Sequence, residues 1–206
     1  MMLQMAKKGN EIYAPMGETT VLLHTCCAPC SSAIIEAMLK NGITPVIYYC
    51  NPNIYPQEEY EIRKNECTRY AQSLGLEIVD ADYDHDNWLE AVRGLEDEPE
   101  RGGRCLKCFK LRLMRTAQYA AERGIKVITT TLASSRWKSL DQINEAGLWA
   151  CEAINKASSA DADKAVVWWD RNWRRNGLQE RRLQIIKEYD FYNQLYCGCE
   201  FSMRKD

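Results

Sequence analysis

The feature of this 206-residue chain that most constrains its fold is a regular alternation of short apolar runs with amphipathic helical stretches, from about residue 19 to about residue 189. Several apolar runs lack the apolar–polar alternation of a strand with one face in water, which favours a largely parallel sheet covered by helices on both faces. No long linker or internal repeat interrupts the pattern. We therefore expect an N-terminal extension over 1–18 and one α/β domain of Rossmann-like (HUP) type over 19–206.

The periodicity also gives the elements of this domain. We expect strands over 20–25, 45–49, 76–80, 126–131 and 165–169, and helices over about 30–40, 57–74, 86–93, 105–123, 139–156 and 178–189. In an open parallel sheet, ligands bind in the crevice beyond the carboxyl ends of the strands. The loop after the first strand is therefore the first place to look for a site.

Composition narrows the class of protein. Hydrophobic residues make up 46% of the chain and charged residues 27%, which excludes a disordered or low-complexity chain. No apolar run is long enough to cross a membrane, and the start of the chain lacks the apolar stretch of a secretory signal, so we expect a cytoplasmic protein without a membrane partner. Ten cysteines are unusual in a chain too large to need disulfides and expected in a reducing compartment. They point to metal or redox chemistry.

Five of the cysteines form two groups that suit metal binding. Cys26, Cys27 and Cys30 stand where the first strand meets the first helix, and Cys105 and Cys108 open the long basic helix. A helix N-terminus favours thiolate, the form of cysteine that ligates metals. A redox dithiol pair and structural thiols are the alternatives. Because roughly 75 residues separate the two groups, an iron–sulfur cluster fits better than a structural zinc site, which usually joins cysteines close in sequence.

Two further groups carry a weaker signal. Cys197 and Cys199 are spaced for a turn, in which they could bind a metal, cycle as a dithiol or simply be buried thiols. Four aspartates, including Asp84, follow the third strand over residues 80–86. One of them could ligate a hard metal ion, although such runs usually cap the next helix or face water.

Charge is polarised along the chain, with a net charge of −10 over residues 1–100 and of +8 over residues 101–206. A basic half of this kind can bind a polyanion such as RNA, although solvated helix faces also produce it. Polar, aromatic and basic side chains after the strands offer stacking and phosphate contacts to RNA. These candidate contacts are Asn51, Asn53, Tyr55, Tyr60, Arg63, Arg136, Lys138, Arg174 and Arg175. A proline-braced turn over 51–56 and helix faces that only keep the chain in solution are the competing interpretations.

The motifs occur in a combination that is more specific than any one of them. The combination joins the cysteine-rich stretch Leu22–Ser32, the turn Asn51–Pro56, the stretch Gly94–Cys108, the threonine run Thr129–Leu132 and the turn Tyr196–Cys199. It spans about residues 20 to 202 and resembles the cobalamin-independent epoxyqueuosine reductases, the QueH family.

This resemblance implies a reaction and its cofactors. Epoxyqueuosine in the wobble position of a tRNA anticodon would lose its epoxide oxygen by a two-electron deoxygenation, which gives queuosine and is the final step of queuosine biosynthesis. The resemblance further implies a 4Fe-4S cluster and an adjacent mononuclear iron, with Cys26, Cys27, Cys105 and Cys108 as ligands. The iron would act on the epoxide oxygen as a Lewis acid, and an electron donor that the sequence does not identify would supply the cluster.

On the same resemblance, Asp84 would ligate or orient the second iron, and Cys197 and Cys199 would relay electrons or protons. The stretches 134–138 and 170–175 depart from the family pattern but keep its basic and aromatic character. Two other classes of protein stay open. One is a zinc-stabilised RNA-binding module without catalysis. The other is an ATP-using tRNA sulfur-transfer or adenylating enzyme, which needs a glycine-rich phosphate loop where this chain has cysteines 26–30.

Overall fold

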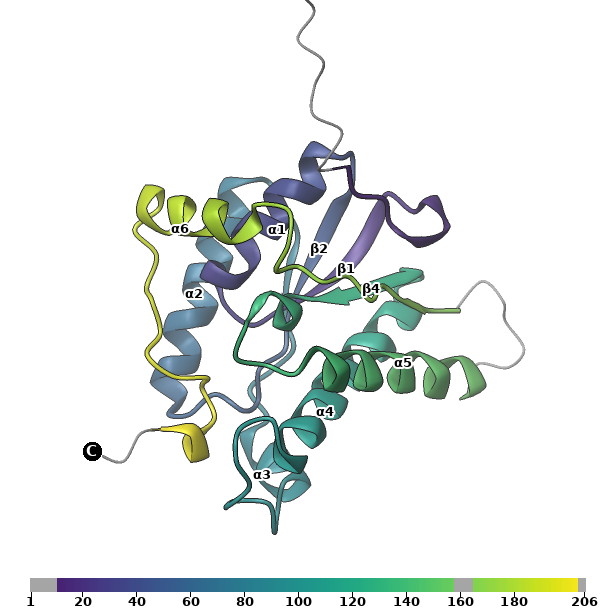
Figure 1. The fold of residues 1–206 in the computed structure, drawn as a ribbon. Helices are drawn as coiled ribbons and strands as arrows, with labels where there is room; N and C mark the ends of the chain where they lie inside the picture. Colours follow the sequence, from purple (N-terminus) through teal and green to yellow (C-terminus); the bar gives the residue numbers. More distant parts are fainter. Residues whose placement is uncertain (1–10, 158–164, 204–206) are drawn as a thin grey trace, which may run out of the picture.

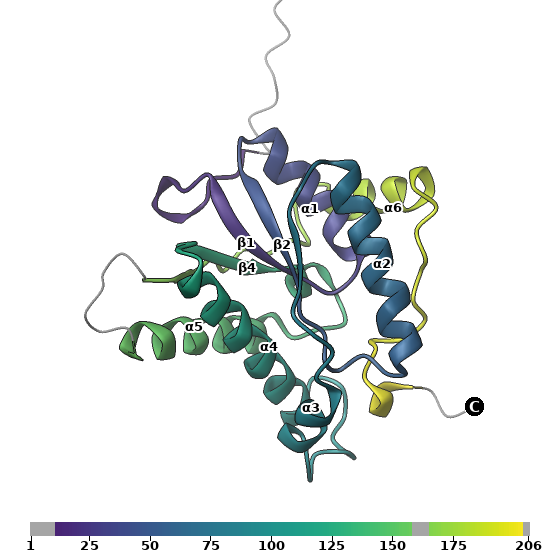
Figure 2. The same ribbon diagram turned by 180° about the vertical axis from the view of Figure 1, so that it is seen from behind.

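A parallel five-stranded sheet lies between two layers of helices in the computed structural model, which describes residues 11–157 and 165–203 (Figures 1 and 2). The strands are β1 (Thr20–Thr25), β2 (Thr44–Tyr49), β3 (Ile78–Asp80), β4 (Val127–Thr130) and β5 (Val167–Trp168), in the spatial order β3-β2-β1-β4-β5. All neighbouring strands pair in parallel. The expected Rossmann-like α/β class is confirmed.

The strand order creates a switch point in the middle of the sheet. The chain winds from β1 through β2 to β3 at one edge and then returns to β4, which pairs with the other side of β1. In β1 all residues except Thr20 are buried, and β4 is buried throughout, as expected for strands covered on both faces. Ligands of open α/β sheets bind beyond the strand ends at such a switch point.

Each of the six expected helices is present among the described residues, with ends that differ by a few positions. Helices α1 (Ala28–Lys40), α2 (Gln57–Ser73) and α6 (Leu178–Glu188) lie on one side of the sheet, and α4 (Gly103–Glu122) and α5 (Leu140–Ala157) on the other (Figures 1 and 2). The short α3 (His85–Ala91) follows β3. Helix α1 begins earlier than expected because Pro29 fits the first helical turn.

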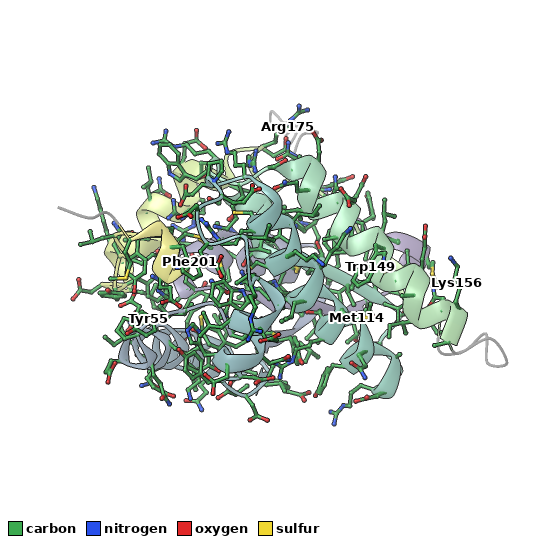
Figure 3. All side chains as sticks on the ribbon, turned by 90° about the horizontal axis from the view of Figure 1, so that it is seen from below. Tyr55, Met114, Trp149, Lys156, Arg175 and Phe201 are labelled. Carbon is green, nitrogen blue, oxygen red and sulfur yellow. The ribbon has the colours of Figure 1, made fainter. Side chains whose placement is uncertain are left out.

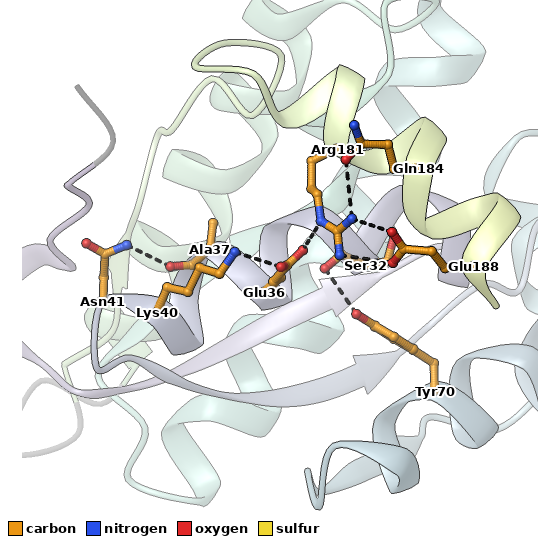
Figure 4. Close-up of polar contacts among 9 residues, drawn as sticks. All are labelled: Ser32, Glu36, Ala37, Lys40, Asn41, Tyr70, Arg181, Gln184 and Glu188. Atoms are coloured by element: carbon orange, nitrogen blue, oxygen red, sulfur yellow. Dashed lines mark hydrogen bonds and ion pairs between the residues drawn. The ribbon is translucent and has the colours of Figure 1, made fainter. Parts of the chain in front are cut away.

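Ion pairs join the helices on the first side. Arg181 of α6 contacts Glu36 of α1 at 2.6 Å and Glu188 at 2.7 Å (Figure 4). The hydroxyl of Tyr70 on α2 donates to the carbonyl of Ser32 on α1 at 3.4 Å. These contacts fix α6 and α2 against α1, whose first turn carries the cysteines.

The C-terminal segment (residues 190–203) runs alongside α2 and returns to the carboxyl edge of the sheet (Figure 1). The amide of Tyr55 donates to the carbonyl of Gly198 at 2.8 Å, so the segment is bonded to the loop after β2. It ends in a short 3-10 helix, Glu200–Ser202. The turn that carries Cys197 and Cys199 is thereby brought beside the loops that follow β1 and β2.

The N-terminal extension predicted over 1–18 falls partly outside the described residues, which begin at residue 11. Ile12 and Ala14 are buried in the main core, and the amide of Ile12 donates to Asn41 Oδ1 at 3.1 Å. The predicted boundary at residue 18 stays a prediction. Among the residues described, there is no helix with the length and apolar character needed to cross a membrane.

Candidate active site

A pocket of about 1140 Å³ lies beyond the carboxyl ends of β1, β2 and β4, at the switch point of the sheet. Its walls come from the loops after these three strands, the first turns of α4, the start of α6 and the C-terminal segment. The pocket therefore gathers residues that lie far apart in the sequence, at the place where an open parallel sheet binds its ligands.

All three cysteine groups of the sequence meet at this pocket, which is lined by Cys26, Cys30, Cys105, Cys108, Cys197 and Cys199. Cys27 is buried directly behind them at the N-cap position of α1. The ligand atoms of Cys26, Cys27 and Cys30 all lie within 4.8 Å of one another. A metal ion or cluster can be held by such a triplet.

The triplet is arranged to hold one thiolate. Hydrogen bonds from the thiols of Cys27 and Cys30, and from the hydroxyl of Thr131 at 3.4 Å, hold the pKa of Cys26 well below its usual range. The hydrogen bond to Cys26 and burial raise the pKa of Cys27, and raise that of Cys30 to about 12. Thiolate is the metal-ligating form. Gln194 of the C-terminal segment also donates to Cys27 Sγ at 3.1 Å.

The second cysteine group lies on the first turn of α4. The backbone amide of Arg101 donates to Cys105 Sγ at 3.3 Å. Cys108 packs with Cys199 and Trp88 in a small cluster apart from the main core. Burial raises the pKa of Cys105 and raises that of Cys199 to about 12, so neither ionises readily without a cation or a metal beside it.

A buried cation faces this group. Arg112, four residues after Cys108 on α4, is only 2% exposed, and its Nη1 lies 3.9 Å from Cys108 Sγ. Its other donors go to the carbonyl of Cys50 and to Asn51 Oδ1. Among the described residues, Arg112 forms no ion pair with a carboxylate. Since an uncompensated buried charge costs several kcal/mol, this geometry suits an anionic group such as a metal–thiolate centre.

The C-terminal segment closes one side of the pocket through a lysine and an arginine. Lys138 Nζ donates to Cys197 Sγ at 3.2 Å. Burial alone would lower the pKa of Lys138, but the sulfur atoms of Cys197 and Cys26 raise it, which keeps the ammonium charged. Arg63 is paired with Glu59 at 2.7 Å and donates to the carbonyls of Cys197 and Tyr196, both at 3.2 Å.

Cations dominate the rest of the lining. Eight Lys and Arg side chains line the pocket, and Glu100 is the single acid among the described lining residues. These cations are Arg63, Arg101, Arg104, Arg112, Arg136, Lys138, Arg174 and Arg182. A cleft lined by one sign of charge attracts ligands of the opposite sign, here anionic ones such as RNA phosphates.

The structure brings most of the predicted RNA contacts to the pocket and leaves, besides the buried Cys27, four predicted site residues outside its lining. Asn51, Asn53, Arg63, Arg136, Lys138 and Arg174 line the pocket. Tyr60 is buried in the core, where its hydroxyl bonds to Asp80. Tyr55 and Arg175 are exposed and do not line the pocket (Figure 3). Asp84 is exposed at the N-cap of α3 and accepts from Asn87 at 3.2 Å.

The lining residues that sequence reasoning missed include Arg104, Arg112 and Gln194. A signal for Arg112 was available, because it stands four residues after Cys108 and seven after Cys105 on the same predicted helix, and so on the same face. Gln194 carried none, since it lies in a segment without periodicity.

Comparison with known proteins agrees with the motifs. The family model for epoxyqueuosine reductase QueH matches residues 21–205. Curated proteins named epoxyqueuosine reductase QueH include those of Histophilus somni, 47% identical over 94% of this chain and 76% of the relative, and Acinetobacter baylyi, 44% identical over 97% and 88%. That of Thermotoga maritima is 32% identical over 89% and 90%. The chain therefore belongs to the epoxyqueuosine reductase QueH family, as its motifs implied.

Proposed function

We propose that this protein reduces epoxyqueuosine to queuosine at the wobble position of tRNA, the final step of queuosine biosynthesis. Family membership and the names of the relatives support the reaction. The observation that carries the proposal is the convergence of three cysteine groups in one cation-lined pocket at the switch point of the sheet. Thiols suit a redox-active metal centre, and the cations suit a substrate carried on RNA.

The reaction sets what the pocket must provide. Removing the epoxide oxygen breaks two C–O bonds, forms a C=C bond and releases water, so two electrons and two protons enter. An iron–sulfur cluster and a neighbouring iron, held by the pocket thiols, would supply the two electrons and a Lewis acid for the oxygen. Protons, orientation and exclusion of water fall to the side chains.

The cysteines of the pocket fit such a centre. We assign Cys26, Cys27, Cys105 and Cys108 as ligands of a 4Fe-4S cluster and an adjacent iron, and Cys30 joins the candidates because its sulfur lies within the same 4.8 Å group. The charge of Arg112 beside Cys108 supports an anionic centre there. Asp84, predicted as a ligand of the second iron, lies outside the pocket lining. We therefore base the assignment of metal ligands on the thiols alone.

We assign Lys138 and Cys197 as the proton donors of the pocket. The ammonium of Lys138, kept charged by neighbouring sulfur, can donate a proton from Nζ, and Cys197 Sγ at 3.2 Å can pass one on. Cys199 is buried against Cys108 and can relay an electron or proton from the segment to the metal-binding thiols. Asn51 and Asn53, both buried, offer hydrogen bonds to the modified base.

Arg136 and Arg174 would bind phosphates of the tRNA, as Arg175 would from beyond the lining. An electron donor, not specified by the residues, reduces the centre between turnovers. We assign the catalytic domain to residues 19–206 and the protein to the cytoplasm, where tRNA modification and reduced thiols coexist.

The test begins with anaerobic reconstitution with iron and sulfide, followed by absorption spectra before and after dithionite. We expect a brown protein with about five irons and four sulfides per chain that bleaches on reduction and converts epoxyqueuosine-tRNA to queuosine-tRNA. Cys105→Ala should lose cluster content and turnover together. Cys151→Ala is the matched control, because Cys151 is buried in α5 away from the pocket.

Two outcomes would reject the proposal. A colourless protein that holds only zinc and binds RNA would favour the zinc-stabilised RNA-binding module. A Cys105→Ala protein with full cluster content and full turnover would remove the ligand assignment.

A further inference from the structure

The mouth of the pocket carries a tryptophan whose exposure is not explained by packing. Trp137 lines the pocket and is 63% exposed, whereas Trp88, which also lines it, is completely buried. Because this indole is exposed and also lines the pocket, its ring is available to a ligand that enters there. Trp137 lies in the stretch 134–138, one of the two that depart from the pattern of the family motifs.

The backbone around Trp137 is fixed by arginines from other parts of the chain. Arg101 donates to the carbonyl of Arg136 at 2.8 Å and to that of Trp137 at 3.0 Å. Arg174 donates to the carbonyl of Lys138 at 2.7 Å. Three successive carbonyls are thus bonded to arginines, which holds the loop in one conformation. A rigid aromatic ring loses little conformational entropy when it binds.

The surroundings of Trp137 select the kind of ligand. The guanidinium of Arg136 lies over the indole ring, 4.7 Å from its centroid, so a base would stack on the opposite face, and further cations line the pocket. A flat apolar face next to a high density of positive charge matches a nucleobase attached to phosphates. Lys138, the residue after Trp137, donates to Cys197 Sγ at 3.2 Å, so the loop that carries the indole also contacts a thiol of the C-terminal turn.

The reaction creates a need for such a face. A base that enters the pocket must leave the stack of its loop, and the base beside it then loses a stacking partner. An aromatic side chain at the mouth replaces that partner and holds the neighbouring base in place while the modified base reaches the thiols.

We propose that Trp137 is a positioning residue whose indole stacks on the nucleobase next to the modified one, with Arg136 beside it at the adjoining phosphate. This inference rests on the proposed function for the identity of the RNA. It adds a contact that sets how well the RNA binds rather than how fast the epoxide is reduced.

The test compares wild type, Trp137→Ala, Trp137→Phe and Trp149→Ala, all reconstituted. Trp149 is the matched control, because it is 42% exposed and has Lys110 over its ring at 5.6 Å but lies on α5 outside the pocket lining (Figure 3). Dissociation constants are measured for anticodon stem-loop RNA carrying guanosine or epoxyqueuosine at the wobble position, by anisotropy of a labelled RNA. Steady-state turnover of the epoxyqueuosine RNA gives kcat and KM.

Trp137→Ala should weaken binding of both RNAs by roughly 5- to 150-fold, the range that loss of one base–aromatic stack produces. Its kcat at saturating RNA should stay within about twofold of wild type, because a uniform binding contact is lost. Trp137→Phe should recover most of the affinity, and Trp149→Ala should bind like wild type. Quenching of tryptophan fluorescence by bound RNA should be smaller in Trp137→Ala than in Trp149→Ala.

The inference is wrong if Trp137→Ala binds both RNAs like wild type, or if Trp149→Ala weakens binding equally. It is also wrong if affinity is unchanged and only electron delivery slows, since Trp137 would then serve a protein donor. The binding arm needs no turnover. Failure of wild type to reduce epoxyqueuosine, with Trp137-dependent RNA binding intact, would reject the proposed reaction and leave the stacking contact standing.

Discussion

Arg63 is expected to hold the C-terminal segment against the pocket, and Arg63→Met tests this. The guanidinium is 3% exposed, forms an ion pair with the buried Glu59 and donates to the carbonyls of Cys197 and Tyr196. Methionine keeps much of the apolar stem and removes all of these bonds. The substitution therefore separates the charge and its hydrogen bonds from the volume of the side chain.

The structure gives the size of the expected loss. Removing one partner of a buried ion pair costs about 3–5 kcal/mol, because the other charge stays buried without compensation. Glu59 keeps one bond from the hydroxyl of Tyr192 at 2.8 Å, so we expect the lower end, about 3 kcal/mol of unfolding free energy. In the double variant Glu59→Gln with Arg63→Met no charge is left unpaired, and we expect a loss smaller by about 1–2 kcal/mol.

Two measurements on the apoprotein separate stability from docking. Urea unfolding under reducing conditions gives the free energy of each variant. Exchange of the Tyr55 amide hydrogen, which is bonded to the carbonyl of Gly198, reports whether the segment is docked. We expect faster exchange in both variants, because both lack the bonds from Arg63 to the segment. Equal stability of the single and double variants, or unchanged protection of Tyr55 in both, would refute this account of Arg63.

Three further predictions follow from the same structure. Gly198→Ala should undock the C-terminal segment and lower turnover while cluster content persists. The reason is that Gly198 has a φ of +110° and that an added Cβ would lie 2.9 Å from Ile54 Cγ1. Exchange of the Tyr55 amide and the iron content of the variant test this prediction. Gly147→Ala should lower the unfolding free energy by about 1–3 kcal/mol despite the better helix propensity of alanine, because the new Cβ overlaps the Trp168 ring; a more stable variant in urea would contradict it. Burial lowers the pKa of His24 to about 3, against about 6.5 in the unfolded chain. The free energy of unfolding should therefore be unaffected by this group above pH 6.5 and should decrease as the pH falls below it, by about 2 kcal/mol near pH 5. The apoprotein carrying His24→Asn should lose correspondingly less stability between neutral pH and pH 5.

The fold was predictable because its strands are buried on both faces. Continuous apolar runs such as Val21–Leu23 distinguish a covered parallel sheet from a sheet with a wet face, and the helices between them dictate parallel connections. The short strands were harder. Of the predicted 165–169 run, β5 keeps only Val167 and Trp168, with the amide of Trp169 donating one further bond to the carbonyl of Ile128, because pairing at the sheet edge depends on a neighbour that local sequence does not specify.

The gathering of the cysteines was also predictable, since loops after parallel strands meet at one edge. Individual contacts were not. Tyr60 and Arg63 lie three residues apart on α2, yet the tyrosine points into the core and the arginine reaches the C-terminal segment. Spacing alone cannot decide which side chain of a helix faces a distant segment. The burial of Arg112 was missed for a related reason, because a buried arginine depends on the groups that surround it in three dimensions.

The C-terminal wall of the pocket is the last part of the pocket to be synthesised. Cys26, Cys30, Cys105 and Cys108 all precede α5, whereas Cys197 and Cys199 reach the pocket only with the C-terminal segment. During synthesis the N-terminal part of a chain emerges first, so the thiols assigned to the metal centre can be in place while this side is still open. Insertion of iron and sulfide is therefore expected to be easiest before the segment docks. Docking of Gly198 against Tyr55 would then be the closing step, and it would shield a newly assembled centre from oxidants in the surrounding water.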